Sequence, residues 1–263
     1  MNPQDKIDYL EDGISEVDLA ASPDLDPALK TVNAARISYR SKKEAFDPRD
    51  AKLAQFLWEH EHTSPYRHSY FTFHVKLPIF VARQLMKYQV GSGFRSYEVD
   101  GNEVSLETFD HMYDLDKGCS WNEVSGRYTQ TSTQFYLPTE LRSNTGHGSK
   151  QSSGKYYNPL SEHDIRFNPE KDTIDAMVEH CKLSLTYYNN LIQNGVAREI
   201  ARTILPQNMY TEVYWTVSLQ SIIWFLHQRL TPDSQFEIRM LAEGIYKLMK
   251  PCLDQLGLEK EKL

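Results

Sequence analysis

The chain has 263 residues, which is enough for one large domain or two small ones with a buried core. Its 16 Tyr, 11 Phe and 4 Trp are typical of a globular protein. The formal net charge of −7 argues against a general nucleic-acid binder, because such proteins carry a basic stripe.

The cysteines and the apolar runs indicate which further classes of protein are excluded. Cys119, Cys181 and Cys252 are odd in number and widely spaced, which indicates neither a disulfide framework nor a zinc knuckle. The first residues are polar, and the best apolar run, 77–86, is too short to span a bilayer. We therefore expect a cytoplasmic protein with no membrane partner.

Hydrophobic periodicity predicts a helix, a strand and a second helix in the first third of the chain. Asp47 and Pro48 are typical of an N-cap and a first helical position, and the apolar stripe that follows ends near His60. Apolar and polar residues alternate over 70–77, which predicts a half-buried strand. Pro78 ends that strand and opens a helix reaching Met86.

The second half reads as mainly helical. The pattern predicts helices over 172–194, 197–205, 218–229 and 231–250, and a strand over 210–215. We expect Ser218 to cap the helix over 218–229. We expect Thr231-Pro232 to begin the helix over 231–250, which ends before Pro251. Few strands separated by helices of unequal length predict an α+β fold. We expect one domain over 1–263, with a small mixed or antiparallel sheet flanked by helices.

Two segments have a different composition. Residues 143–154 are rich in Ser and Gly, so we expect a loop and a candidate ligand lid. Residues 92–119 are strongly acidic, and Asp100-Gly101 within them is a type I′ hairpin signal. We interpret this segment as a solvated surface hairpin; a partner-docking surface is the alternative.

A short polar block suits the binding of a phosphorylated planar ligand. It runs Asn-Glu-Val-Ser-Gly-Arg-Tyr from Asn122 to Tyr128. Arg127 offers a guanidinium fork for phosphate oxygens, and Ser125 adds a neutral donor. Arg202 and Arg229 lie on apolar helices, where an arginine needs an anion or a carbonyl partner, so we expect ligand contacts. For Arg198 we favour a salt bridge to a carboxylate.

The sequence signals for a metal site, a nucleophilic cysteine or a Rossmann-type cofactor site are weak or absent. His60, His62 and His68 have poor metal-ligand spacing and no Cys or carboxylate cluster beside them, so we predict no metal site. For His60 we expect capping or hydrogen bonding instead. Cys252 has no partner base beside it and reads as a packed thiol. No Walker loop or Gly-x-Gly-x-x-Gly occurs, so a cofactor would be held by a non-Rossmann arrangement.

Taken together, the segments resemble the flavin-dependent thymidylate synthases over nearly the whole chain, from Ala34 to about Ile245. The blocks that carry the resemblance, in order, are His62-Thr-Ser-Pro65, His68 before Phe71-Thr-Phe-His-Val75, Pro78-Ile-Phe-Val-Ala-Arg-Gln84, Asn122 to Tyr128, Gly195-Val-Ala-Arg-Glu-Ile-Ala-Arg202, Leu205-Pro206 with Tyr210-Thr211, and Trp215-Thr216. The family signature is Arg-His-Arg, seven residues, then Ser. Here Lys87-Tyr88-Gln89 aligns with the triplet, and removing 92–119 restores the spacing of seven to Ser125, so the acidic segment looks like an insertion.

The resemblance implies a homotetramer that binds FAD and dUMP at subunit interfaces. NADPH would supply reducing equivalents and 5,10-methylenetetrahydrofolate the methylene group. Reduced flavin would carry the hydride, and no enzyme cysteine would attack the pyrimidine.

The resemblance also assigns residues by matched position. Those expected to hold dUMP, chiefly its phosphate and sugar, are Gln84, Lys87, Ser125, Gly126, Arg127, Arg202 and Arg229. Arg229 would also be catalytic, stabilising negative charge on the pyrimidine. Those expected to contact FAD are Ser64, Lys87, Tyr88, Gln89, Glu123, Ser218, Gln220 and Trp224, with His62 near the flavin–folate face.

The chain departs from the family pattern in the flavin set. Lys87 keeps the positive charge of the family arginine but lacks its guanidinium fork. Tyr88 cannot carry a positive charge, and Gln89 replaces a charged arginine by a neutral side chain. Trp224 stands where a smaller polar residue is usual. Each lost charge-assisted contact costs about 1.5–3 kcal/mol, which predicts weaker or re-routed FAD binding unless Trp224 stacking or the insertion compensates.

Three functions are therefore considered. The first is reductive methylation of dUMP to dTMP. The second is a family variant that makes another 5-substituted pyrimidine nucleotide, such as 5-hydroxymethyl-dUMP. The third, from a different class, is a catalytically silent nucleotide-binding protein. Retained flavin separates the third from the others, and product mass separates the first two.

Overall fold

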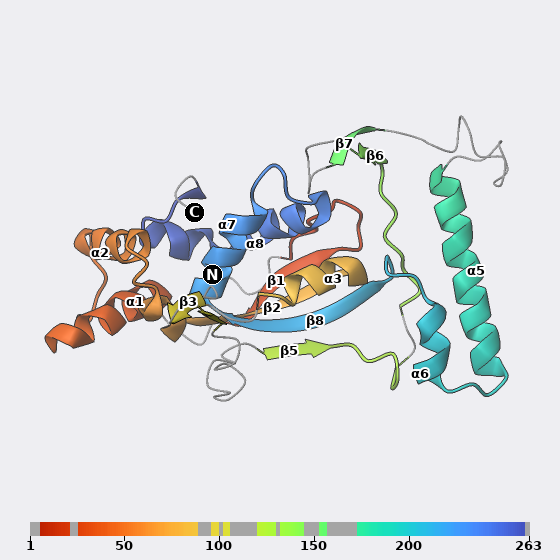
Figure 1. Cartoon of the computed structure of the whole chain (residues 1–263), viewed down its shortest axis with the longest axis horizontal. Coiled ribbons are helices and arrows are strands. Elements are labelled where there is room, and N and C mark those ends of the chain that lie inside the picture. The colour runs from red at the N-terminus through yellow and green to blue at the C-terminus, as the bar shows by residue number, and fades with distance from the viewer. Residues whose placement is uncertain are drawn as a thin grey trace.

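The structure is a computed structural model that describes residues 6–21, 26–88, 96–99, 102–105, 120–129, 132–144, 153–156 and 173–260. An antiparallel four-stranded sheet of order β1-β2-β8-β5 lies at its centre (Figure 1). The strands are β1 (Glu16–Ala21), β2 (Tyr70–Pro78), β8 (Tyr210–Ser218) and β5 (Ser120–Glu123). The predicted α+β fold with a small antiparallel sheet is confirmed.

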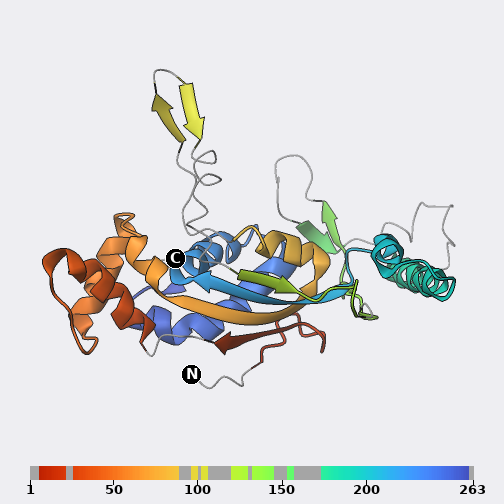
Figure 2. The same ribbon diagram turned by 90° about the horizontal axis from the view of Figure 1, so that it is seen from below.

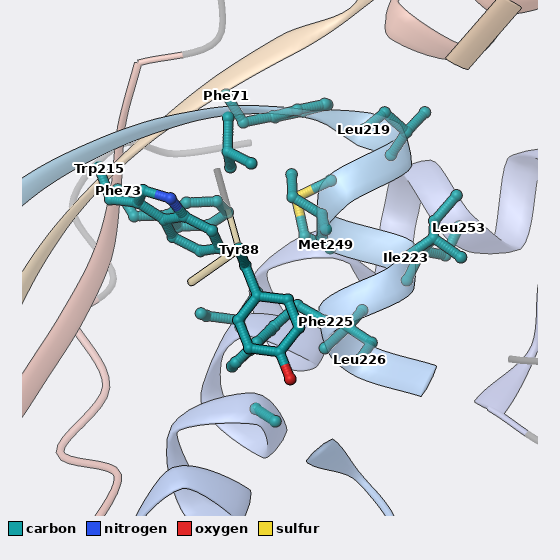
Figure 3. Packing of buried hydrophobic residues seen from close by; sticks show 14 of the residues in the cluster. Phe71, Phe73, Tyr88, Trp215, Leu219, Ile223, Phe225, Leu226, Met249 and Leu253 are labelled. Atoms are coloured by element: carbon teal, nitrogen blue, oxygen red, sulfur yellow. The ribbon is translucent and has the colours of Figure 1, made fainter. Parts of the chain in front are cut away.

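The core lies between one face of this sheet and the helices packed on it. Alternation places Phe71, Phe73, Val75 and Leu77 of β2 inside, each at most 1% exposed. Phe73 pairs in register with Trp215 of β8, and their ring centroids are 5.7 Å apart. Figure 3 shows these rings beside the side chains of the last two helices. The predicted strand over 70–77 is therefore confirmed, and the one over 210–215 extends to residue 218.

Two long helices cover that face. Helix α7 (Leu219–Arg229) begins where Ser218 accepts a hydrogen bond from the Ser221 amide at 3.3 Å, which confirms the predicted cap. Helix α8 (Phe236–Gln255) packs beside it. Short helix α3 (Ile79–Leu85) follows β2 directly, as predicted from Pro78.

The start and the end of α8 differ from the prediction. It begins at Phe236 rather than Thr231, because the Thr231 and Ser234 hydroxyls hydrogen-bond to each other and to the Gln228 carbonyl, which turns the chain. It also continues through Pro251 instead of ending before it. Burial of Cys252, Leu253 and Leu256 offsets the backbone hydrogen bond that proline cannot donate.

Two N-terminal helices lie at one end of the molecule (Figure 1). Helix α2 (Pro48–Glu59) has the predicted Asp47 N-cap, completed by a capping box with Asp50. Helix α1 (Pro27–Arg36) was not predicted, although Asp26 accepts from the Leu29 amide at 2.8 Å in the same kind of cap. A 3₁₀ helix, η1 (Ile37–Tyr39), follows α1, and a second, η2 (Ser64–His68), leads into β2.

At the opposite end stand α5 (Thr173–Gln193) and α6 (Arg198–Ala201), the latter continued by the 3₁₀ helix η5 (Arg202–Ile204) (Figures 1 and 2). Both predicted helices are confirmed, and Gly195 ends the first with a positive φ of 82°. Cys181, Ser184 and Tyr188 are the buried residues of α5. Leu183 and Tyr187 are 52% and 56% exposed.

Two small hairpins complete the described chain. Strands β3 (Ser96–Val99) and β4 (Asn102–Ser105) pair with Val99 opposite Asn102, as the predicted hairpin requires. Asp100-Gly101, where the type I′ turn is predicted, lies outside the described residues. Strands β6 (Arg142–Asn144) and β7 (Ser153–Tyr156) also pair, so the ends of the predicted 143–154 loop are strands. The rest of that loop, the rest of 92–119 and Gln89 lie outside the described residues. None of the helices in the described ranges combines the length and hydropathy that a bilayer crossing needs.

Candidate active site

A cavity of about 570 Å³ opens where α7 ends and the chain turns towards α8. Its lining residues are Gln84, His227, Gln228, Arg229, Thr231, Asp233 and Gln235. Two residues of the predicted substrate set, Gln84 from α3 and Arg229 from α7, therefore come together here. Their side chains approach from helices that are far apart in sequence and that both pack on the sheet.

Arg229 is held in place by a buried tyrosine. Its Nε donates a hydrogen bond of 2.6 Å to the Tyr88 hydroxyl, which in turn donates to Gln228 Oε1 at 2.7 Å. The guanidinium carbon lies 5.5 Å from the centroid of the same ring. Because one phenol both accepts from Arg229 and stacks beneath it, the orientation of the guanidinium is fixed before any ligand binds.

Tyr88 belongs to the core rather than to an open surface. It is 6% exposed and meets Phe225 edge-on at a centroid distance of 5.0 Å (Figure 3). Burial raises the pKa of its phenol, and Arg229 opposes that rise, so the hydroxyl stays neutral at ordinary pH. A flavin contact is expected of Tyr88, but its hydroxyl already hydrogen-bonds to Arg229 and Gln228.

Gln84 is connected to a buried carboxylate through one intermediate residue. Its Nε2 donates to Gln235 Oε1 at 2.6 Å, and Gln235 Nε2 donates to Glu237 Oε2 at 2.9 Å. The other carboxylate oxygen of Glu237 accepts from Tyr136, at 2.9 Å, and from Arg142. Burial by itself raises the pKa of Glu237, but these hydrogen bonds outweigh it and leave the pKa below its usual value.

The rest of the predicted dUMP set lies elsewhere. Ser125, Gly126 and Arg127 form a turn after β5, in which the Tyr128 and Thr129 amides donate to the Ser125 carbonyl. Arg202 begins η5. The two segments are joined by Arg198, whose Nη1 donates to the Tyr128 carbonyl at 3.2 Å, a contact with a carbonyl in place of the predicted carboxylate. None of these residues lines the cavity of Gln84 and Arg229.

Arg127 and Arg202 are both exposed, and no ion pair joins either to a carboxylate within the described ranges. The ring of Tyr128 lies 5.1 Å from the Arg127 guanidinium carbon. Two exposed cations on neighbouring segments are suited to bind an anion.

The predicted flavin residues fall on two surfaces. Gln220 is buried; its side chain accepts a hydrogen bond from Arg67 Nε at 2.7 Å and donates one to Thr63 Oγ1 at 2.9 Å. These hydrogen bonds join α7 to the segment that contains His62 and Ser64, which are both exposed. Ser218 is engaged as the cap of α7. Glu123 accepts from Thr211 at 2.8 Å at the far end of β5, and Lys87 is exposed after α3.

Trp224 is the one large aromatic side chain on the exposed part of α7. It is 40% exposed and stacks on His227, a cavity residue, with 5.6 Å between ring centroids. Gln220, Trp224 and Gln228 are spaced four apart and therefore share one face of α7. That face leads from the η2 segment to the cavity.

Sequence reasoning missed several residues of this site. Asp233 and Gln235 were missed because 231–250 was predicted as one continuous helix, and Gln228 because it looked like an ordinary polar residue at the end of the 218–229 helix. Glu237 was considered only as a salt-bridge partner for an arginine. The available clue was Thr231-Pro232 followed by Asp and Ser, which is typical of a turn. No prediction linked Tyr88 with Gln228, which is 140 positions away.

Three further predictions concern His60, the cysteines and metal binding. His60 Nδ1 lies 2.9 Å from the Phe56 carbonyl, which confirms the hydrogen-bonding role expected of it. Cys181 and Cys252 are buried, so Cys252 is a packed thiol as predicted, and Cys119 is outside the described residues. Within those residues, no group of three His, Cys, Asp or Glu side chains is arranged to hold a metal ion.

Comparison with known proteins gives the family. The profile of the family described as thymidylate synthase complementing protein matches residues 23–253. The chain belongs to the flavin-dependent thymidylate synthase family. A flavin-dependent thymidylate synthase of Kosmotoga olearia is 35% identical over 219 residues, which cover 83% of this chain and 79% of that protein. One from Thermotoga neapolitana is 32% identical over 246 residues, covering 93% and 89%.

A solved structure supports the same membership of the flavin-dependent thymidylate synthase family. The UMP/dUMP methylase PolB from Streptomyces cacaoi, bound with 5-Br dUMP, superposes with a TM-score of 0.68 at 25% identity, covering 92% of this chain and 94% of that one. The fold, the family and these relatives together make the protein an enzyme of the methyltransferase class.

Proposed function

We propose that the protein converts dUMP to dTMP by reductive methylation, with 5,10-methylenetetrahydrofolate as carbon donor and NADPH as reductant. The observation that carries the proposal is Arg229, held by Tyr88 at the wall of a cavity that Gln84 also lines. A fixed guanidinium is suited to stabilise negative charge on a pyrimidine carbonyl as the ring is activated. Membership of the family supports the choice of pyrimidine.

In this proposal dUMP is held by two groups of residues. Gln84 and Arg229 face the base and sugar, with Lys87 nearby in sequence. Ser125, Gly126, Arg127 and Arg202 hold the phosphate, since the two exposed guanidiniums offer charged donors and the turn after β5 offers neutral ones. Within one chain these groups lie on different elements.

The separation of the two groups supports a homotetramer with each site shared between subunits. Helix α5 stands at the end of the molecule, and Leu183 and Tyr187, one helical turn apart, expose more than half of their surface (Figure 1). Ile200 and Ile204 on the adjacent α6 and η5 are 58% and 40% exposed. Apolar side chains gathered in this way are typical of a surface covered by another subunit.

FAD fits part of the residue set assigned to it. Trp224 presents an exposed indole on the α7 face that leads to the cavity, and Ser64, Lys87 and His62 are accessible. An aromatic face of this kind suits a flat ring system. Tyr88 fits less well, because its hydroxyl serves Arg229. When bound, reduced FAD supplies the hydride, while the residues of this chain bind and orient the nucleotide and exclude water.

The experiment that tests the proposal is the mass of the nucleotide product. The protein is incubated with dUMP, methylenetetrahydrofolate, NADPH and added FAD, and in parallel with UMP, because PolB is described as acting on both. A product heavier than dUMP by one methylene supports thymidylate synthesis. A product heavier by one methylene and one oxygen atom would instead show 5-hydroxymethyl-dUMP, the second function considered. Unchanged dUMP beside an active family member would contradict both.

The third function, a silent nucleotide-binding protein, is separated by a simpler observation. A purified sample that retains or takes up FAD, seen by its visible absorption, contradicts that reading. The orientation of Arg229 at the cavity wall, held by Tyr88, favours an enzyme, because a guanidinium fixed in advance can stabilise charge that develops on a bound ring.

A further inference from the structure

The short chain of side chains from Glu237 to Gln84 has a defined direction. An ionised carboxylate only accepts hydrogen bonds, whereas an amide has one accepting end and one donating end. Glu237 therefore requires the NH₂ group of Gln235, which turns the Gln235 oxygen towards Gln84. That oxygen in turn requires the NH₂ group of Gln84. The orientation of both amides follows from the charge of a residue that does not touch the cavity.

The consequence appears at the cavity wall. With Nε2 of Gln84 donating to Gln235, its Oε1 has no hydrogen bond from the described residues, and Gln84 lines the cavity. An oxygen in that position accepts a hydrogen bond from whatever binds there. A phosphate at neutral pH only accepts hydrogen bonds, so it cannot be the partner of this oxygen.

We infer that Glu237 is a positioning residue that, through Gln235, fixes Gln84 as a hydrogen-bond acceptor for a donor group of the bound nucleotide. The inference rests on the proposed function and refines it. The chemistry of the partner is a hydroxyl or a ring N–H. In dUMP these are the sugar 3′-hydroxyl and the pyrimidine N3–H, so Gln84 reads the nucleoside part rather than the phosphate.

Glu237 is suited to this task because it is well anchored. It is 2% exposed, and Arg142 and Tyr136 occupy its other oxygen. Arg142 also stacks over Phe236, with 4.9 Å between the guanidinium carbon and the ring centroid. The lowered pKa keeps Glu237 ionised throughout the neutral range, so the direction of the amides does not change there.

The structure predicts the effect of an isosteric change. In Glu237→Gln, the introduced amide must turn its oxygen to Arg142, which only donates, and its NH₂ to Gln235. Gln235 then reverses, and Gln84 reverses after it, which places an NH₂ group where the acceptor was. We expect the dissociation constant of dUMP for the FAD-loaded protein, measured by calorimetry, to rise about tenfold.

The rescue variant distinguishes orientation from a merely structural role. In the double variant Gln235→Glu/Glu237→Gln, the carboxylate introduced at position 235 accepts from both neighbours, so Gln84 regains its original direction with the same total charge. We expect dUMP affinity to return to within about threefold of the wild type. Glu243→Gln, the same change on the same helix outside this network, is the control and should leave affinity unchanged.

Analogues tested on the wild-type protein identify the donor and do not depend on any variant folding. If the sugar 3′-hydroxyl donates the hydrogen bond to Gln84, 2′,3′-dideoxyuridine monophosphate should bind about tenfold more weakly than dUMP. If the pyrimidine N3–H donates it, N3-methyl-dUMP should bind about tenfold more weakly. Undiminished binding of both analogues would overturn the inference. So would normal affinity in Glu237→Gln, or a loss that the double variant does not restore. Failure of the wild type itself to bind dUMP would instead overturn the proposed function.

Discussion

The phenol of Tyr88 stands at the middle position of the aligned triplet, where the family signature has histidine. A tyrosine hydroxyl can accept from Arg229 and donate to Gln228 at once, and here it does both within 2.7 Å. Its ring also packs on Phe225 in the core. We interpret the substitution as a second way to hold Arg229, for which we propose a catalytic role, in which hydrogen bonding and burial replace the charge-bearing side chain.

Removing the hydroxyl tests that interpretation. In Tyr88→Phe the ring still supports Arg229, but Nε of Arg229 and Oε1 of Gln228 both lose their partner. We expect kcat to fall about tenfold with little change in KM for dUMP, because orientation of the guanidinium matters most when charge develops. Steady-state kinetics measure both quantities.

The matched control is Tyr66→Phe. Tyr66 is fully buried, and its hydroxyl donates to the Ala54 carbonyl at 2.6 Å, away from the cavity residues. This variant should lose about 1–3 kcal/mol of stability, as Tyr88→Phe should, yet retain its kcat. Equal loss of kcat in both variants would show that Tyr88 matters only for stability.

Asp50 predicts how stability depends on pH. It is fully buried; burial raises the pKa of its carboxyl, but hydrogen bonds from the Asp47 amide, Lys43 and Arg36 bring the pKa below 3.8. A carboxyl with a lowered folded-state pKa stabilises the protein above its unfolded pKa, and that contribution disappears as the pH falls through the folded pKa. Urea unfolding at about pH 7 and about pH 3 should therefore show a smaller loss of stability on acidification in Asp50→Asn than in the wild type. An identical loss in both would contradict this.

Helix α8 contains a proline that does not end it. Pro251 is exposed, and its missing N–H leaves one helical hydrogen bond unmade. We expect Pro251→Ala to raise the free energy of unfolding by about 1–2 kcal/mol, since the helical gain exceeds the added entropy of the unfolded chain. Chemical denaturation measures the change. Lys247→Ala, an exposed substitution one turn earlier, should change stability by less than about 0.5 kcal/mol.

Strands β3 and β4, the described part of the acidic segment 92–119, form a sheet of their own. Among the described residues, β3 and β4 pair with each other and join no other sheet. We propose that 92–119 is dispensable for folding, because closing a shorter loop changes the entropy only slowly with length. Deleting it with a short join should leave the melting temperature within a few degrees and the assembly unchanged on gel filtration. Loss of assembly would show that the insertion is part of a subunit contact.

The elements that the sequence predicted are those with a strong local signal. Residues 70–77 alternate over eight positions, and Asp47-Pro48 caps α2, so both were found with nearly correct ends. Asp26-Pro27 carries the same cap signal and was overlooked. Strand β5 is a short edge with mainly exposed side chains, so it has no clear alternation. The bracing of Arg229 and the Glu237 network join residues more than 90 positions apart, which no local pattern reveals.

The residues expected to bind dUMP lie on different parts of the chain. Gln84 and Arg229 line the cavity, whereas Arg127 and Arg202 lie on the turn after β5 and on η5. Long-range attraction cannot replace contact, because charges separated by more than about 10 Å are screened in salt. If all four bind one nucleotide, we propose that the second pair comes from a neighbouring subunit, which the exposed apolar residues of α5 and α6 are suited to contact.

Subunit complementation decides this directly. Arg229→Ala removes the group at the base and Arg202→Ala a group at the phosphate, so each homo-oligomer should have less than about 1% of wild-type turnover. In mixed oligomers formed by co-expression, a site that combines Arg229 of one chain with Arg202 of another is intact in about a quarter of random pairings. We therefore expect turnover in the mixture well above that of either parent, with FAD bound in all three preparations. A mixture as inactive as its parents would place both arginines in a site formed by one chain.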